Sequence, residues 1–184
     1  MKRCSWVNLN NPLCIKYHDE EWGIPSHDDN YLFEILVLES FQAGLSWSCI
    51  LNKREDIRKA FDNFNYKKIA NYNEHKIEEL LSNDKIIRNK LKIKAIIKNA
   101  QIYQDIQKEY QTFSNYIWHF TNNKIISNNS NIIPTKNDLS IKISKDLENK
   151  GMKYVGPTII YSFLEAIGII NDHEKECYKY NKIS

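Results

Sequence analysis

The chain has 184 residues, long enough for one domain with a substantial hydrophobic core. With 42% hydrophobic and 27% charged residues, its composition is that of an ordinary soluble globular protein. The net charge of +3 permits nucleic-acid binding without arguing for it, so a DNA-binding face would need local clusters of basic residues. No apolar run reaches the roughly 20 residues of a membrane span, and no apolar segment typical of a secretory signal follows Met1.

Helical spacing of apolar residues dominates the chain and predicts an all-α protein. Residues 1–27, which contain Pro12, Gly23 and Pro25, are predicted to form an irregular N-terminal segment. Asp28 or Asp29 is expected to cap the first helix. Helices are predicted, in chain order, at about 30–43, 48–62, 66–71, 74–82, 88–109, 138–149 and 157–168. The polar, Asn- and Ser-rich residues 121–137 are predicted to form a surface loop.

Cysteine and histidine residues occur near both ends of the chain, Cys4 and His18 at one end and His173 and Cys177 at the other. The last two are four residues apart, which on a helix places both side chains on one face. Two Cys and two His complete a tetrahedral shell without an open position, as in structural zinc sites. The spacing is also compatible with four incidental residues. The other cysteines, Cys14 and Cys49, are expected to be small core residues, and so few cysteines favour a reducing, cytoplasmic location.

Glu39 interrupts the apolar face of the predicted helix 30–43, because it shares that face with Leu32, Ile35 and Leu36. A buried carboxylate costs free energy unless something pairs with it. A structural partner, such as an Arg or a helix N-terminus, and a functional role are both compatible with the pattern.

Aromatic residues are frequent in the segments around Glu39: Trp6, Tyr17, Trp22 and Trp47. Each ring alone is best interpreted as core. Several rings around one buried carboxylate, however, suit a flat, positively charged ligand, through stacking, cation–π attraction and a charge-assisted hydrogen bond.

Residues 150–158 form a short glycine-containing segment between two predicted helices. Gly151 ends the first helix, and Gly156 and Pro157 begin the second, whose N-terminal amides could hold a phosphate. Lys142, Lys145, Lys150 and Lys153 make the nearby surface basic. Taken alone, the segment is more typical of an ordinary corner between two helices with solvated lysines.

Taken together, these residues resemble the bacterial 3-methyladenine DNA glycosylase I (Tag) family, within the helix-hairpin-helix glycosylase superfamily. The matching stretches are 3–7 (RCSWV), 17–23 (YHDEEWG), 38–47 (LESFQAGLSW) and 154–158 (YVGPT), running on to Gly168 and 171–173 (NDH). They span nearly the whole chain in the family's order, and the second and third are highly specific.

The resemblance implies one glycosylase domain over residues 1–184, with a helix-hairpin-helix at about 138–168 and terminal segments 1–27 and 171–184 tied by zinc. It implies that one structural zinc ion is bound by Cys4, His18, His173 and Cys177, with no organic cofactor. The expected partner is alkylated double-stranded DNA, and free 3-methyladenine is the expected product. A cytoplasmic monomer without membrane association is expected.

The resemblance also assigns site residues. Glu39 is the expected catalytic residue, contacts the excised base together with Tyr17, and faces a pocket lined by Trp47 with Trp6 nearby. DNA backbone contacts are implied for Gly151, Lys153, Gly156 and Thr158. The family lacks the catalytic aspartate of many helix-hairpin-helix glycosylases, and Asp172 and Glu176 are not assigned that role. Thr158 stands where bifunctional relatives carry a lysine, which implies hydrolysis without strand cleavage.

Two alternatives remain at this point. A zinc-stabilised DNA-binding module without catalysis would bind DNA and release no base, but the retained Glu39, Tyr17 and Trp47 argue against it. A metalloenzyme would need an open coordination position, which four protein ligands would fill.

Overall fold

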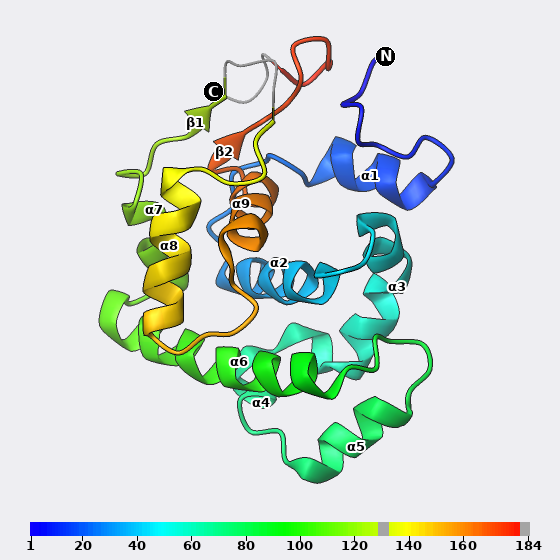
Figure 1. The fold of residues 1–184 in the computed structure, drawn as a ribbon, viewed down its shortest axis with the longest axis vertical. Helices are drawn as coiled ribbons and strands as arrows, with labels where there is room; N and C mark the ends of the chain where they lie inside the picture. The colour runs from blue at the N-terminus through cyan, green and yellow to red at the C-terminus, as the bar shows by residue number, and fades with distance from the viewer. Residues whose placement is uncertain (129–132, 181–184) are drawn as a thin grey trace.

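The computed structural model describes residues 1–128 and 133–180 and consists almost entirely of helices (Figure 1). The elements are α1 (Pro12–Glu20), α2 (Asp29–Gln42), α3 (Trp47–Ala60), the 3-10 helix η1 (Asp62–Phe64), α4 (Tyr66–Ile69), α5 (Glu74–Ser82), α6 (Lys90–Tyr110), α7 (Phe113–His119), β1 (Ile126–Ser127), α8 (Asp138–Asn149), α9 (Pro157–Ala166) and β2 (Ile170–Asn171). The two short strands pair in parallel, Ile126 with Ile170 and Ser127 with Asn171. The all-α prediction is confirmed, with this pair as the only sheet in the described part.

Helix α2 forms the centre of the fold. All its side chains from Leu32 to Phe41 are buried, as expected for a helix that others enclose. Figure 1 shows it between α3, α6 and α9. Asp28 caps it by accepting a hydrogen bond from the Asn30 amide at 2.9 Å, so the first of the two predicted caps is correct. The central position of α2 buries Glu39 with its apolar neighbours.

Helices α8 and α9 form the predicted corner, joined by residues 150–156. Gly151 follows the end of α8 with a φ of +100°, a backbone conformation that glycine adopts at little cost. Pro157 occupies the first turn of α9. The helix boundaries predicted here are confirmed to within two residues.

Four segments differ from the sequence-based expectation. Residues 1–27 are not wholly irregular, because α1 begins at Pro12 behind an Asn11 cap, where proline favours the first turn. Helix α7 was not predicted. The residues after β2 form turns, so His173 and Cys177 do not lie on a helix. The predicted loop 121–137 contains β1, and its residues 129–132 lie outside the described part.

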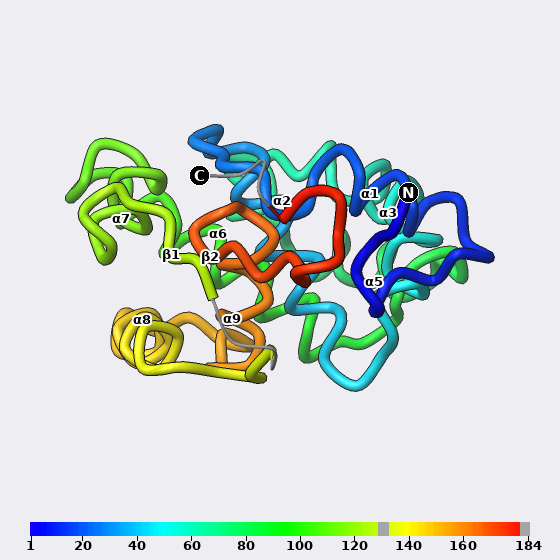
Figure 2. Tube along the Cα trace, turned by 90° about the horizontal axis from the view of Figure 1, so that it is seen from above, coloured from blue at the N-terminus to red at the C-terminus, as the bar shows by residue number. Residues whose placement is uncertain are grey.

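The N-terminal segment and the turns that follow β2 lie side by side (Figure 2). The amide of Tyr178 donates to the Lys2 carbonyl at 3.0 Å, and the Ser5 amide donates to Glu174 Oε1 at 2.9 Å. This contact brings residues from both ends to one place. Among the described helices, none has the length and apolar character needed to cross a membrane.

Candidate active site and metal centre

The four predicted metal ligands form one buried cluster. The ligand atoms of Cys4, His18, His173 and Cys177 all lie within 4.8 Å of one another. The Sγ of Cys4 is 3.5 Å from Nδ1 of His173, and the Sγ of Cys177 is 3.5 Å from Nε2 of His18. Ideal Zn–S and Zn–N bonds at a tetrahedral angle place sulfur and nitrogen about 3.5 Å apart. The donor set and its spacing therefore fit a tetrahedral metal ion.

The contacts around the cluster prepare its histidines for metal binding. His18 Nδ1 lies 2.8 Å from Asp19 Oδ1, and the Arg3 guanidinium bonds both oxygens of Asp19. The Arg3 hydrogen bonds hold the pKa of Asp19 well below its usual range. An ionised Asp19 accepts the Nδ1 proton of His18 and leaves the Nε2 lone pair directed into the cluster.

Burial also favours the neutral imidazoles that a metal ion requires. It lowers the pKa of His173 to about 3 and that of His18 below its usual value. Burial raises the pKa of the Cys4 thiol, so that a thiolate here needs a nearby cation.

A cavity of about 360 Å³ lies beside this cluster. Its lining residues are Trp6, Tyr17, Trp22, Glu39, Gln42, Trp47, Ile133, Ser162 and Glu165. Trp6 comes from the N-terminal segment, Tyr17 from α1, Glu39 from α2 and Trp47 from the start of α3. The structure thus brings together all four residues that the sequence analysis assigned to the base pocket.

Several buried polar atoms in the cavity have no hydrogen-bond partner in the described protein. They are Trp6 Nε1, Tyr17 Oη, Glu39 Oε2 and Trp47 Nε1. Buried polar groups are nearly always satisfied in folded proteins, so four such atoms around one cavity indicate a binding site for a polar ligand. Three of them are donors, and the fourth belongs to a carboxyl group.

The sequence is compatible with a structural partner for Glu39, but the described residues provide none. Glu39 is 4% exposed, and no arginine or helix N-terminus contacts it among the described residues. Burial raises the pKa of Glu39 to about 8. The empty cavity therefore favours the neutral acid at neutral pH, and a cationic ligand would favour the carboxylate.

An aromatic cluster connects the cavity to the metal centre. The rings of Tyr17 and Trp47 have centroids 5.2 Å apart, and those of Trp6 and Trp22 lie 5.0 Å apart. Trp22 packs edge-on against His173 at 4.6 Å, and Trp6 packs against the ring of His18 at 5.6 Å. Displacement of the metal ligands would therefore move the walls of the cavity.

The cavity continues into a smaller hollow of about 240 Å³ that leads to the corner between α8 and α9. The two hollows share Glu39, Gln42 and Ser162, and the second is also lined by Gly44, Leu45 and Thr158. A ligand that enters along the exposed side of Thr158 can thus reach Glu39.

The predicted DNA-binding residues lie at this corner. Lys153 and Thr158 are exposed, and Gly156 begins α9 without a side-chain cap on its first amides. Both backbone groups of Lys153 are bound by the buried side chain of Asn99, at 2.9 and 2.8 Å. Sequence reasoning missed Asn99, although a polar residue within the apolar face of α6 was a readable signal.

Lys92 is a second residue that sequence reasoning missed. Its ammonium group is buried and donates to the carbonyls of Phe41 and Ala43, at 2.8 and 2.6 Å. These hydrogen bonds satisfy carbonyl groups at the C-terminal end of α2, directly before the Gly44–Leu45 turn.

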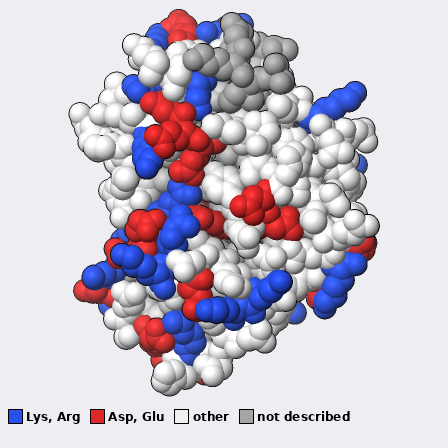
Figure 3. Space-filling view, turned by 180° about the vertical axis from the view of Figure 1, so that it is seen from behind, with Lys and Arg blue, Asp and Glu red and all other residues white. Residues whose placement is uncertain are grey.

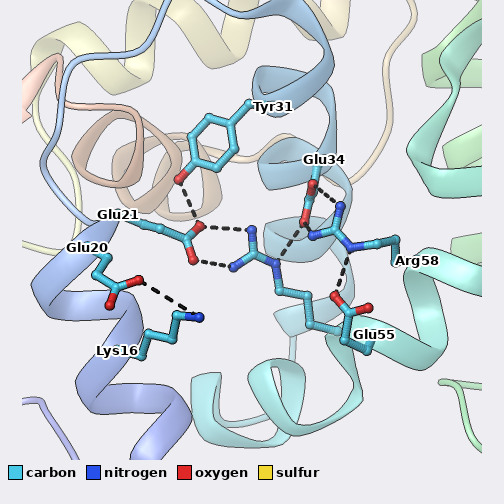
Figure 4. A network of polar contacts seen from close by, with 8 residues as sticks. Lys16, Glu20, Glu21, Tyr31, Glu34, Glu55 and Arg58 are labelled. Atoms are coloured by element: carbon cyan, nitrogen blue, oxygen red, sulfur yellow. Dashed lines mark hydrogen bonds and ion pairs between the residues drawn. The ribbon is translucent and has the colours of Figure 1, made fainter.

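A larger hollow of about 820 Å³ lies on the other side of Tyr17. Figure 4 shows the polar network there. Arg54 donates to both oxygens of Glu21 at 2.8 Å and to Glu34 at 2.7 Å, and Arg58 also binds Glu34. The arginines and glutamates of this hollow are paired with one another, so we assign ligand binding to the smaller cavity and a supporting role to this network.

The surface charges are not segregated on the face opposite to that of Figure 1. Figure 3 shows basic and acidic side chains side by side there. At the α8–α9 corner, by contrast, Lys142, Lys145 and Lys153 are all exposed. Lys150 is partly engaged by Glu109 at 3.1 Å. The corner is therefore the better candidate for contact with an anionic polymer.

Replacing Glu39 with glutamine is expected to stabilise the unliganded protein increasingly as pH rises. The folded-state pKa of about 8 exceeds the ordinary value of 4.5, so stability contributed by the neutral acid is complete below about pH 4.5 and is lost as pH rises to about 8. At pH 7 the difference should be on the order of 3 kcal/mol. Urea unfolding of Glu39→Gln and wild type from pH 5 to 8 measures it. The exposed Glu78→Gln is the control, and equal pH dependence in all three proteins would contradict the burial argument.

Known proteins are similar to this chain in sequence and in fold. Residues 6–180 match the family described as methyladenine glycosylase. The chain is 42% identical over 183 residues to DNA-3-methyladenine glycosylase 1 of Escherichia coli K12, covering 98% of this chain and 97% of that protein. It is 41% identical over 178 residues to DNA-3-methyladenine glycosylase of Haemophilus influenzae, with 95% and 96% covered.

Solved protein structures have the same fold as this chain. A variant of 3-methyladenine DNA glycosylase I in complex with 3-methyladenine superimposes with a TM-score of 0.93 at 36% identity, covering 100% of both chains. The Staphylococcus aureus enzyme, whose structure addresses 3-methyladenine recognition, gives 0.92 at 36% identity, covering 98% of this chain and 97% of that one. The chain therefore belongs to the methyladenine glycosylase family.

Proposed function

We propose that this protein is a monofunctional DNA repair glycosylase that excises 3-methyladenine from alkylated DNA. The observation that carries the proposal is the cavity in which Glu39 and three unpartnered ring donors face one another. The names of the relatives, which refer to the same base, support it. We further propose that residues 1–184 act as one domain with a helix-hairpin-helix fold.

The reaction breaks the bond between N9 of the base and C1′ of the sugar. Methylation at N3 gives the adenine a positive charge, and the departing base becomes neutral when it takes the bonding electrons. Water adds to C1′ and releases its proton to solvent. The damaged nucleotide must first be flipped from the duplex, at a cost of a few kcal/mol that is smallest for damaged bases.

The side chains of the cavity select the charged base. The rings of Trp47 and Tyr17 attract a cation by roughly 1–2 kcal/mol when water is excluded, with Trp6 completing the aromatic wall. Glu39 accepts hydrogen bonds from the base edge, and its carboxylate is favoured only when the cation is present. Glu39 thus recognises the base and stabilises positive charge on the reacting nucleotide.

Double-stranded DNA would be held at the α8–α9 corner. The uncapped amides at the start of α9, at Gly156 and Thr158, suit a phosphate group, and Gly151 and Lys153 belong to the same turn. Thr158 cannot form a Schiff base, which supports hydrolysis without strand cleavage.

We also propose that the buried cluster holds one structural zinc ion, bound by Cys4, His18, His173 and Cys177. The ion would fix the two ends of the chain and supply no reaction step, since four protein ligands leave no open position. Its removal should therefore act on stability and on pocket shape. None of the four cysteines forms a disulfide, which supports a reducing, cytoplasmic location, and we propose a monomer.

Release of free base from N-methylated duplex DNA tests the proposed function. Wild type should release 3-methyladenine, and Glu39→Gln should be about ten- to a hundredfold slower, the value of a hydrogen bond to a charged group. Trp47→Ala should show a comparable loss, and Glu78→Gln should match wild type. Release by Glu39→Gln at the wild-type rate would reject the pocket assignment. DNA binding by wild type without any base release would favour a non-catalytic binding module.

A further inference from the structure

The base cavity contains a second carboxyl group that the sequence analysis did not select. Glu165, on α9, lines the same cavity as Glu39 and Trp22. The residue is only 9% exposed. A carboxyl group is seldom buried to this extent without a partner or a ligand, so its surroundings indicate what it does.

Asp172 interacts with Glu165. The Tyr161 hydroxyl donates to Asp172 Oδ2, while Oδ1 of the same carboxylate accepts from no N–H or hydroxyl group in the described protein. Burial together with the charge of Asp172 raises the pKa of Glu165 well above its ordinary value. A neutral Glu165 that donates its O–H to Asp172 would retain a carbonyl oxygen as an acceptor toward the cavity.

We propose that Glu165 is a second base-contacting residue, whose carboxyl oxygen accepts an N–H of the exocyclic amino group of the base. That amino group carries two N–H donors, and Glu39 and Glu165 together provide an acceptor for each. A base with an oxo group at the same ring position would face two acceptors and lose both hydrogen bonds. The carboxyl pair would thus determine specificity for an amino-substituted purine; this inference rests on the proposed function.

Binding of two free bases, 3-methyladenine and 3-methylhypoxanthine, separates this role from a purely structural one. Quenching of tryptophan fluorescence gives both dissociation constants. Glu165→Met should weaken 3-methyladenine binding roughly three- to tenfold, the value of one hydrogen bond, and should not weaken 3-methylhypoxanthine binding. Glu165→Gln should retain the wild-type preference, because its amide donates to Asp172 and keeps a carbonyl acceptor.

The outcomes are distinct. Equal weakening of both bases by Glu165→Met, or an unchanged preference, would overturn the role of Glu165 while leaving the proposed function intact. A wild-type protein that neither binds 3-methyladenine nor releases it from DNA would instead reject the proposed function. If Glu165→Met does not fold, Tyr161→Phe provides the second variant. Loss of the donor to Asp172 should lower the preference in the same direction, and an unchanged preference would overturn the proposal.

Discussion

Replacement of Cys177 with serine is expected to abolish stoichiometric zinc binding and to lower the melting temperature by on the order of 10 °C. Cys177 Sγ lies within 3.6 Å of the ligand nitrogens of both His18 and His173. Its loss would therefore remove one of the four ligands and leave the coordination shell incomplete. Metal binding at such sites contributes directly to folding free energy, and a change of several kcal/mol shifts the melting temperature of a protein of this size by this amount. Metal analysis and thermal unfolding, each with and without chelator, measure both effects.

Cys14→Ser is the matched control, since Cys14 is equally buried but lies outside the cluster. Its melting temperature should keep the chelator sensitivity of wild type, whereas that of Cys177→Ser should have lost it. A wild-type protein that is purified without metal and melts identically in chelator would refute the zinc assignment.

Zinc loss should also impair base binding, because the metal ligands support the pocket through aromatic contacts. Trp22 touches His173 and Trp6 touches His18, and both tryptophans line the cavity. The proposed metal ion would thus be coupled to recognition by packing and would take no part in the reaction itself. This coupling explains why residues from the two ends of the chain belong to one functional unit.

The helices with strong apolar periodicity could be predicted from the sequence, and those without it could not. Helices α2 and α8 carry clear caps, Asp28 and Asn137, and α9 begins with Pro157 in its first turn. The sequence analysis does not predict α1, because proline usually interrupts a helix. Here Pro12 instead begins the helix, and Asn11 caps it. Local patterns identify helices well only when the role of a cap or a proline is clear.

The candidate site was predictable in its residues and not in its geometry. Glu39 could be identified because it interrupts an apolar face. The cysteines and histidines near the two ends could be identified because their side chains are typical zinc ligands: Cys4, His18, His173 and Cys177. The pairing of Glu165 with Asp172 could not be inferred, because it depends on the turn that follows α9. The hydrogen bonds between Asn99 and the backbone of Lys153 likewise join residues 54 positions apart. Such contacts arise from tertiary structure, which local spacing does not encode.

Gly168→Ala is expected to lower the free energy of unfolding by roughly 3–5 kcal/mol, a second large effect beside that of Cys177→Ser. A Cβ at this position would lie 2.4 Å from the Pro25 nitrogen and 2.6 Å from the Ile24 carbonyl carbon, both backbone atoms. The φ of +77° adds about 1–2 kcal/mol for a residue other than glycine. The neighbouring backbone cannot easily withdraw, because the Ser26 amide donates to Ile167 at 3.1 Å and the Ser26 carbonyl accepts from Trp118.

Gly44→Ala separates the steric contribution from the conformational one. Gly44 has a similar φ of +83°, but a Cβ there would meet nothing within 4 Å. Its variant should therefore lose only about 1–2 kcal/mol in urea unfolding, and equal losses for both variants would refute the steric argument. Because Gly168 lies between α9 and the residues that provide Asp172 and His173, its contact with Pro25 is a second tie between the ends of the chain. A loss of metal affinity in Gly168→Ala, and not in Gly44→Ala, would show that close backbone packing and zinc hold the same two segments together.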